Sequence, residues 1–373
     1  MGSWKWLLSI LVLALCCRAD RSSLQLGVVL PLTGEQALLG EQARRGVELA
    51  LDEANRTGGI AGSKVRASFQ DSQGDSSRAA SAMLGMIREH HVQIIIGDLL
   101  SGPTLAMAPI AEAHRVVLVT PSASAATISA AGRYIFRLGP LDSREVAASA
   151  GWAITQGFHT AAIVFVLDRR GDDQARVFRE SFSAAGRSVV SSESFGSGTD
   201  DLRPILLPIR AKHPDVIFLT AQDSRQVIEV VHQARGLGIE SQFLAAGPFL
   251  PEAESGAEGL MVARLKGFDE GDPTPTQRQF RAEFRERFRA KPDWFAAHAY
   301  DAATMVLEGL RSGARTGEEV RAFLDHRREF QGASGRILLD DNGDDVGKAV
   351  LLKVFSVGGH SPPTEVVGLT PAP

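Results

Sequence analysis

The feature that most constrains the fold of this chain is the regular alternation of short apolar runs with helical patterns. The first run, "LQLGVVLPL" at residues 24–32, has the continuous apolar character that a strand buried on both faces of a sheet requires. A helical pattern follows, with Leu39, Val47 and Ala54 on one face. Because strand followed by helix, many times over, implies parallel strands joined by right-handed crossovers, the sequence predicts an α/β fold with doubly wound sheets.

The alternation starts afresh after "YIFRLGPLDSRE", residues 134–145, which predicts a second sheet of the same design. The 373-residue chain is long enough for two such domains. It continues with helical patterns at 275–290 and 296–312 and with "GRILLDDNGDDVGKAVLLKVF", which predicts two strands around a tight, acidic hairpin turn. These pieces have no sheet of their own. We therefore expect two doubly wound lobes joined by three crossing segments, with 24–140 plus 268–335 as lobe one and 141–267 plus 336–373 as lobe two.

The N-terminal segment "MGSWKWLLSILVLALCCRAD" has the order of parts of a secretory signal peptide, at residues 1–19. Its apolar run is shorter than the roughly 20 residues that a membrane-spanning helix needs. Both cysteines, Cys16 and Cys17, lie in this segment, so a disulfide framework in the mature chain is excluded. A cysteine after such a run is also typical of a lipoprotein signal with the lipid on Cys16 or Cys17, although Leu15 is large for that cleavage. Either signal predicts an exported protein.

The composition and the short motifs exclude several classes of function. A net charge of −4, without a long block of Lys or Arg, argues against nucleic acid as a partner. His90, His91 and His114 lack the spacing of a metal site, so we expect no metal and no cofactor. "GDDVGK" lacks the spacing and the hydroxyl of a phosphate-binding loop, and "DDNGDD" lacks the final glutamate of a calcium loop.

Ser101 lies in the polar turn "DLLSGPT" after the buried run "VQIII". As a nucleophile it would need a G-x-S-x-G elbow, but Leu99 and Pro103 occupy the glycine places, and we found no reacting constellation elsewhere. Two roles stay open and are compatible: the N-cap of the next helix and an anchor for an anionic ligand. The turns "TPSAS" and "AQDS" follow other predicted strands, and ligands of open parallel sheets bind at such strand ends.

Taken together, "GVVLPLTGEQALLGEQARRGVELALDEANRTGGIAG", "IIGDLLSGPTLAMAPIAEAHRVVLVTPSAS", "YIFRLGPLDSREV" and "HAYDAATMVLEGL" resemble the type I periplasmic binding proteins of the leucine, isoleucine and valine branch. The resemblance covers nearly the whole mature chain. It implies the two-lobed Venus-flytrap architecture and a non-enzymatic receptor that delivers a small ligand to an ABC importer.

The resemblance also implies where the ligand is held. In lobe one, a serine after the third strand and a small-small-Ser/Thr triplet in the next turn would bind the ligand carboxylate; they correspond to Ser101 and to Ser122, Ala123 and Ser124. The apolar part of the ligand would be shaped by Leu39, Leu100 and Phe295. Arg170, Asp173, Gln222 and Phe249 would close the site from lobe two.

One departure from the family's pattern concerns the other end of the ligand. Amino-acid binders of the family place a glutamate after the strand "QFLAAG" to pair the ligand ammonium, whereas this chain has Gly247 there. An unpaired buried ammonium costs several kcal/mol. This widens the expected ligands from branched-chain amino acids to related acids and amides, unless Asp172, Asp173 or Asp223 replaces the glutamate.

The resulting expectation is a monomeric solute-binding protein, located in the periplasm or otherwise outside the cytoplasm, whose partners are a small molecule and an ABC permease in the inner membrane. The alternative is a ligand-sensing receptor or regulatory module of the same fold without a transport role. No spanning or signalling segment follows the second lobe in "SPPTEVVGLTPAP", which favours transport.

Overall fold

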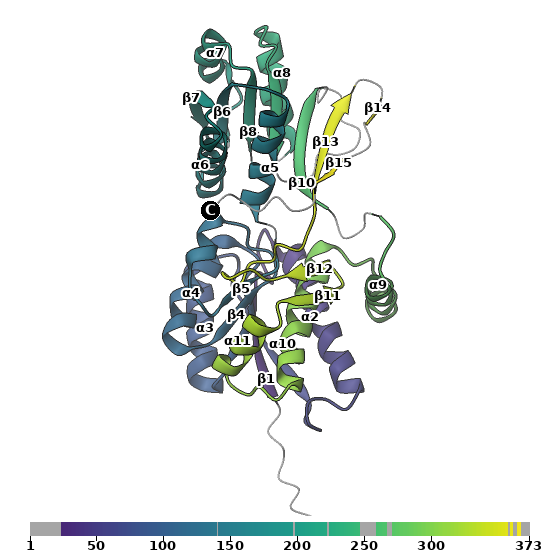
Figure 1. Ribbon diagram of the computed structural model, residues 1–373. Coiled ribbons are helices and arrows are strands. Elements are labelled where there is room, and N and C mark those ends of the chain that lie inside the picture. Colours follow the sequence, from purple (N-terminus) through teal and green to yellow (C-terminus); the bar gives the residue numbers. More distant parts are fainter. Residues whose placement is uncertain are drawn as a thin grey trace, which may run out of the picture.

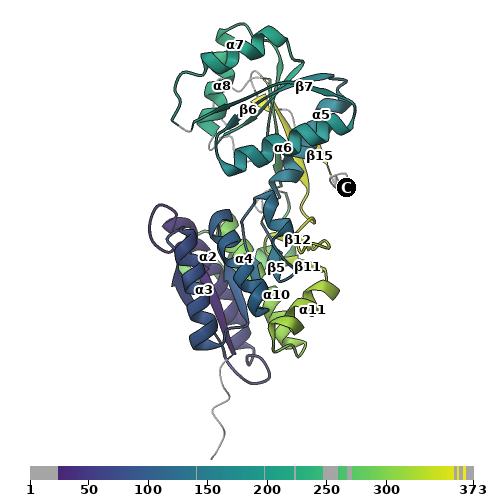
Figure 2. The same cartoon turned by 90° about the vertical axis from the view of Figure 1, so that its left-hand side faces the viewer.

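The computed structural model describes residues 24–139, 141–196, 198–221, 224–246, 259–266, 271–356, 359–360 and 364–366. Two α/β lobes lie one above the other, and the chain passes between them at three places (Figures 1 and 2). Within those ranges, the molecule contains no helix with the length and apolar character needed to cross a lipid bilayer.

Lobe one is built on a five-stranded parallel sheet with the order β2-β1-β3-β4-β5. Its strands are β1 (Leu24–Leu30), β2 (Val65–Asp71), β3 (Ile94–Gly97), β4 (Val117–Thr120) and β5 (Ile135–Arg137). Its helices are α2 (Ala37–Arg56), α3 (Ser76–His90), α4 (Ser101–His114), the 3₁₀ helix η1 (Ala126–Ala130), α9 (Pro275–Phe288), α10 (Trp294–Arg311) and α11 (Gly317–His326).

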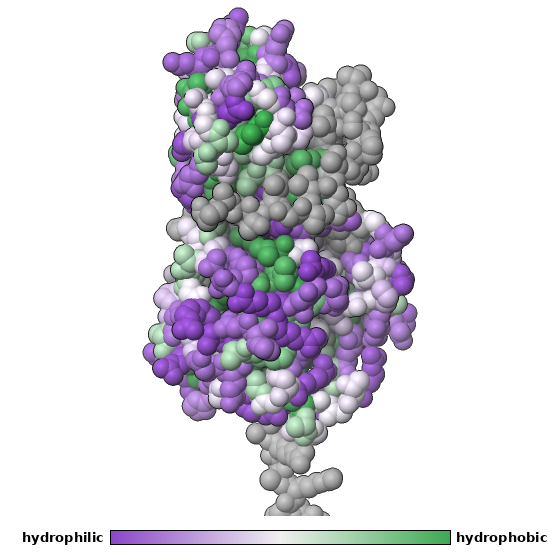
Figure 3. Space-filling view, viewed as in Figure 1, coloured by the Kyte–Doolittle hydropathy of each residue, from purple (hydrophilic) through white to green (hydrophobic). Residues whose placement is uncertain are grey.

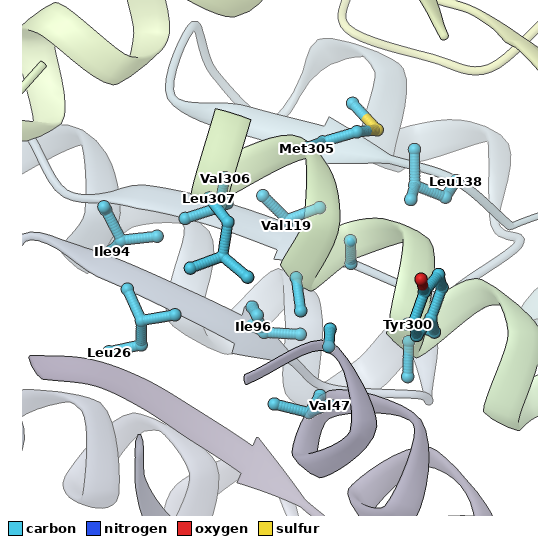
Figure 4. Packing of buried hydrophobic residues seen from close by; sticks show 14 of the residues in the cluster. Leu26, Val47, Ile94, Ile96, Val119, Leu138, Tyr300, Met305, Val306 and Leu307 are labelled. Atoms are coloured by element: carbon cyan, nitrogen blue, oxygen red, sulfur yellow. The ribbon is translucent and has the colours of Figure 1, made fainter. Parts of the chain in front are cut away.

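Both faces of this sheet are covered, as the continuous apolar strands require. One core contains the sheet residues Leu26, Ile96 and Val119 with side chains from α2 and α10, and Figure 4 shows this packing. The second core lies against α3 and α4. Helices α2 and α10 approach so closely that a Cβ on Gly46 would lie 2.2 Å from the carbonyl oxygen of Ala296, so this contact requires glycine.

Lobe two contains a mixed sheet with the order β14-β13-β10-β9-β8-β6-β7, in which β15 also pairs with β13. Strands β6 to β10 pair in parallel, and β13 pairs with β10 in the antiparallel sense. The strands are β6 (Thr160–Val166), β7 (Ser188–Phe195), β8 (Val216–Thr220), β9 (Gln242–Ala246), β10 (Leu260–Leu265), β13 (Val350–Ser356), β14 (Gly359–His360) and β15 (Thr364–Val366). The helices are α5 (Asp142–Thr155), α6 (Arg169–Ala184), α7 (Arg203–Lys212) and α8 (Ser224–Gly236).

The three crossings follow β5, β10 and β12 (Gly335–Leu338). Two buried arginine side chains hold the third crossing in place. Arg137, at the end of β5, is fully buried, and its Nε donates to Asp344 Oδ1 at 2.7 Å. The same guanidinium donates to the carbonyl of Ala125. On the lobe-two side, Arg144 donates to the carbonyl of Lys348. The third crossing is therefore tied to both lobes by buried arginines.

The predicted hairpin around "DDNGDD" is wrong. The strand before it, β12 (Gly335–Leu338), pairs with β11 (Glu329–Gly332), whereas the strand after it, β13, joins the sheet of lobe two. The acidic segment does turn tightly, since Leu339 and Asp345 form an antiparallel bridge. Its carboxylates are used to fix the crossing: Asp344 pairs with Arg137, and Asp345 accepts the N–H groups of Leu338 and Gly347.

Candidate functional site

Two turns at the carboxyl edge of the first sheet are joined through Ser101. Its Oγ accepts the N–H groups of Ser124, at 3.2 Å, and Ala125, at 3.1 Å. The turn after β3 is thus tied to the turn after β4. A hydroxyl with two acceptor positions in use keeps its proton available to donate. Ser101 therefore offers one hydrogen-bond donor at the start of α4.

The predicted N-cap role of Ser101 is wrong. Leu100 is the N-cap residue of α4, it has no capping side-chain bond, and Ser101 is the first helical residue. The sequence could not distinguish these roles, because the N–H groups that donate to the hydroxyl come from a turn more than 20 residues later. The first N–H groups of α4 consequently have no side-chain cap, and such groups suit an anion.

The three residues Ser122–Ser124 are placed differently from one another. Ser122 is buried, and its hydroxyl donates to the carbonyl of Leu99 at 2.8 Å. Ala123 is buried, and its N–H donates to Thr120 Oγ1. Ser124 is half-buried, and its hydroxyl donates to Asp142 Oδ2 at 3.1 Å. Of these residues, Ser124 is the one whose side chain reaches toward lobe two.

Asp142 connects the serine turns with the cationic side chain of lobe two. Its Oδ2 accepts from Ser124 and from Arg170 Nε, the latter at 2.7 Å. Burial would lower the pKa of Arg170, but the charge of Asp142 and its hydrogen bond outweigh burial and raise the pKa. Arg170 therefore faces the predicted lobe-one anchor across the boundary between the lobes, as a protonated guanidinium already paired with a carboxylate.

A small cavity lies at this boundary. Its walls come from lobe one and from the first turns of α5 and α6: Ala125, Ala126, Asp142, Ser143, Arg170, Asp173, Gln174 and Val177. Figure 3 shows apolar surface on lobe one directly below the junction of the lobes. Ser124 immediately precedes the two alanines, so the serine turns lie next to this cavity in the chain.

Glu145, one helical turn after Asp142, is buried beside the same junction. Its Oε1 accepts the N–H of Leu265, at the second crossing, at 2.7 Å. Burial, with a smaller contribution from the charge of Asp142, raises the pKa of Glu145 to about 8. The junction therefore contains a carboxyl group that titrates near neutral pH.

Three of the predicted apolar residues are half-buried on lobe one. Leu39 and Phe295 pack against its main core, and Phe295 also meets Trp294 edge-on, with ring centroids 5.1 Å apart. Leu100 lies against Gly74, at the start of the turn before α3. None of the three lines the cavity. Gln222, Gly247 and Phe249, together with Asp223, lie outside the described residues.

Two residues of this site were missed from the sequence. Asp142 stands at the start of a predicted helix, and nothing in the sequence indicates its contacts with Ser124 and Arg170. Gln174 occupies a position that gives no signal in the sequence, since only the folded chain shows that it is buried at the cavity wall. No group of His, Cys, Asp and Glu side chains in the described part of the chain has the arrangement of a metal site.

Comparison with known proteins assigns the architecture. The family described as "Periplasmic binding protein" matches residues 23–355. The chain belongs to this family. Its members are non-catalytic solute-binding proteins, and this one has the two-lobed fold that the sequence predicted. The resemblance to the leucine, isoleucine and valine branch is confirmed as well.

Individual relatives are similar over most of their length. The leucine-, isoleucine-, valine-, threonine- and alanine-binding protein of Pseudomonas aeruginosa is 22% identical, covering 84% of this chain and 85% of the relative. The leucine-binding protein LivK of Thermotoga maritima is 25% identical, with a TM-score of 0.73, covering 92% of this chain and 99% of that one. A solute-binding protein of Rhodopseudomonas palustris, solved with 3,4-dihydroxybenzoic acid, is 21% identical, with a TM-score of 0.72, covering 94% of this chain and 98% of that one.

Proposed function

We propose that this periplasmic binding protein captures a small carboxylate-bearing ligand outside the cytoplasm and delivers it to an ABC permease in the inner membrane. The ligand is a branched-chain amino acid or a related acid or amide. It lies between the lobes, with its carboxylate on the serine turns of lobe one, and the lobes close over it by hinge motion about the three crossings. The protein acts as an exported monomer with the predicted lobe boundaries, except that the last one lies after β12 and not at 335, because β12 pairs with β11 and its Ile337 packs in the core of lobe one.

The observation that carries this proposal is the arrangement around Ser101. Its hydroxyl keeps a proton to donate, and it stands at the uncapped start of α4, where the helix dipole and free N–H groups favour negative charge. The hydroxyl of Ser124, one turn away, is already bonded to a carboxylate oxygen, that of Asp142. Ser101 can bind a ligand carboxylate without burying an extra cation, and Ser124 joins it by exchanging its bond to Asp142 for one to the ligand, because a hydroxyl has one proton.

The relatives support the ligand class without narrowing it. The Pseudomonas aeruginosa protein is named for aliphatic amino acids, and the Rhodopseudomonas palustris protein was solved with an aromatic acid. What these ligands share is a carboxylate beside an apolar group. That shared chemistry agrees with hydroxyl donors on lobe one. We propose that Leu39, Leu100 and Phe295, which are half-buried on the same lobe outside the small cavity, contact the apolar part of the ligand.

The experiment is a thermal-shift screen of aliphatic amino acids, their 2-oxo analogues, aromatic acids and amides, followed by calorimetry on each ligand that raises Tm. The variant Ser101→Ala/Ser124→Ala should weaken binding of the carboxylate ligand by roughly 2–4 kcal/mol, since hydrogen bonds to a charged group are lost. Ser81→Ala on the exposed face of α3 is the matched control and should bind as the parent does. An unchanged affinity in the double variant would remove the serine turns from the site.

A further inference from the structure

The wall of the interlobe cavity contains two buried polar atoms without a hydrogen-bond partner among the described residues, Asp173 Oδ2 and Gln174 Nε2. Gln174 is only 1% exposed, and its Oε1 accepts from the hydroxyl of Thr220, so its side-chain position is set from one end. A buried polar atom left without a partner destabilises the folded protein, because it has lost its hydrogen bonds to water. Two of them on one cavity wall indicate a partner that arrives from outside the chain.

The atom that matters most is the carboxylate oxygen of Asp173. Its other oxygen, Oδ1, meets Arg176 at 3.5 Å, a long contact on an exposed guanidinium that is also bound to Glu180. The nearby cation Arg170 is already paired with Asp142. The cavity wall of lobe two thus carries one balanced ion pair and one further carboxylate whose Oδ2 lacks a donor.

We infer that Asp173 is the specificity-determining residue of lobe two, and that it accepts a hydrogen bond from a nitrogen of the ligand, an ammonium or an amide N–H. This inference rests on the proposed function. Gln174 Nε2, the adjacent donor, donates a hydrogen bond to an acceptor atom of the same ligand. The ligand class becomes a carboxylate that also bears a nitrogen donor, and simple acids without nitrogen are disfavoured because they would leave Asp173 buried and unpaired.

The test compares Asp173→Asn with Asp172→Asn. Asp172 is the preceding residue of α6, is exposed, and does not line the cavity, so the control removes the same charge from the same helical turn. Affinities are measured by calorimetry for leucine and for its 2-oxo analogue, 4-methyl-2-oxopentanoate, and for any other pair from the screen that differs only in nitrogen. Asp173→Ala repeats the test in case the asparagine variant does not fold.

The parent protein should prefer the nitrogen-bearing member of a pair. Asp173→Asn should weaken the binding of that member about 10- to 100-fold and the binding of the 2-oxo analogue by less than about 3-fold. Asp172→Asn should change neither affinity. Equal weakening of both members, no weakening, or a parent that binds only nitrogen-free acids would overturn the inference and leave the proposed function standing. If the parent binds no carboxylate at all, the proposed function fails together with it.

Discussion

The two lobes meet the cleft with edges of opposite character. Lobe one presents neutral hydroxyls that are bonded to neighbouring turns: Ser101 to Ser124, Ser122 to Leu99, and Thr120 to Asp98. Lobe two presents the charged side chains Asp142, Arg170 and Asp173 at the cavity and Glu145 beside it, and two buried polar atoms of the wall, Asp173 Oδ2 and Gln174 Nε2, are unpaired. The comparison teaches that the serine turns of lobe one form a preorganised surface, whereas the cavity wall of lobe two contains groups whose interactions are completed from outside.

The largest effect is expected at Arg137, which connects the turn after β4 to the third crossing through Ala125 and Asp344. Arg137→Met would leave Asp344 buried without its cation, and breaking such a pair typically costs about 3–5 kcal/mol. We expect the free energy of unfolding, measured by urea denaturation, to fall by this amount. Arg336→Met, which breaks an exposed pair with Glu329, is the control and should cost far less, because solvent screens an exposed pair. Equal costs would show that the buried brace contributes no more than a surface pair.

On lobe two, by contrast, we expect a substitution that raises the stability of the protein, Glu145→Gln. Glu145 has a folded-state pKa of about 8, against 4.5 as the ordinary value, so between these values the folded protein holds a proton that the unfolded chain has lost. Stability therefore falls as pH rises from about 4.5 through 8, and the loss is complete above that range. Glu145→Gln keeps the oxygen that accepts from Leu265 and has no ionisation penalty.

Glu145→Gln should accordingly equal the parent in stability near pH 4 and exceed it by about 2–4 kcal/mol near pH 9. Denaturation at a series of pH values measures this difference. Glu53, whose pKa burial raises to about 7, titrates in the same window and contributes the same background to both proteins. A constant difference across the series would mean that Glu145 does not titrate in that window.

The alternation of strands and helices could be predicted from the sequence because apolar runs and helical faces are local patterns. Both doubly wound sheets and the three crossings follow from it. Helix α11 and the β11–β12 hairpin were missed, and the strands around "DDNGDD" were assigned to one hairpin. Whether two neighbouring strands pair with each other depends on the sheet edge each one reaches, and that is information from distant parts of the chain.

In the candidate site, too, some features could be predicted from the sequence and others depend on the fold. Ser101 and Ser124 were predicted because a family motif marks them, and Arg170 and Asp173 because their loop aligns with a loop of the family. That Ser101 accepts two N–H groups and that Asp142 joins Ser124 to Arg170 are consequences of tertiary placement. Residue type showed which groups could bind a ligand. The partners that satisfy some groups and leave others unpaired became visible only in the fold.

The smallest effect is expected at Thr120 of lobe one. It tests whether hydrogen bonds of the hydroxyl, rather than packing, hold the turn after β4 in place. Thr120 is buried, its hydroxyl donates to the carbonyl of Asp98 at 2.7 Å, and it accepts the N–H of Ala123 at 3.1 Å. Thr120→Val keeps the volume and removes both bonds, which should lower the free energy of unfolding by about 1–2 kcal/mol. Thr120→Ser keeps the hydroxyl and should recover most of that loss.

Because Ala123 adjoins Ser122 and Ser124, the valine variant should also weaken carboxylate binding. If stability falls and binding does not, the serine turns are held by their other contacts, and the preorganisation assigned to lobe one is broader than this hydroxyl.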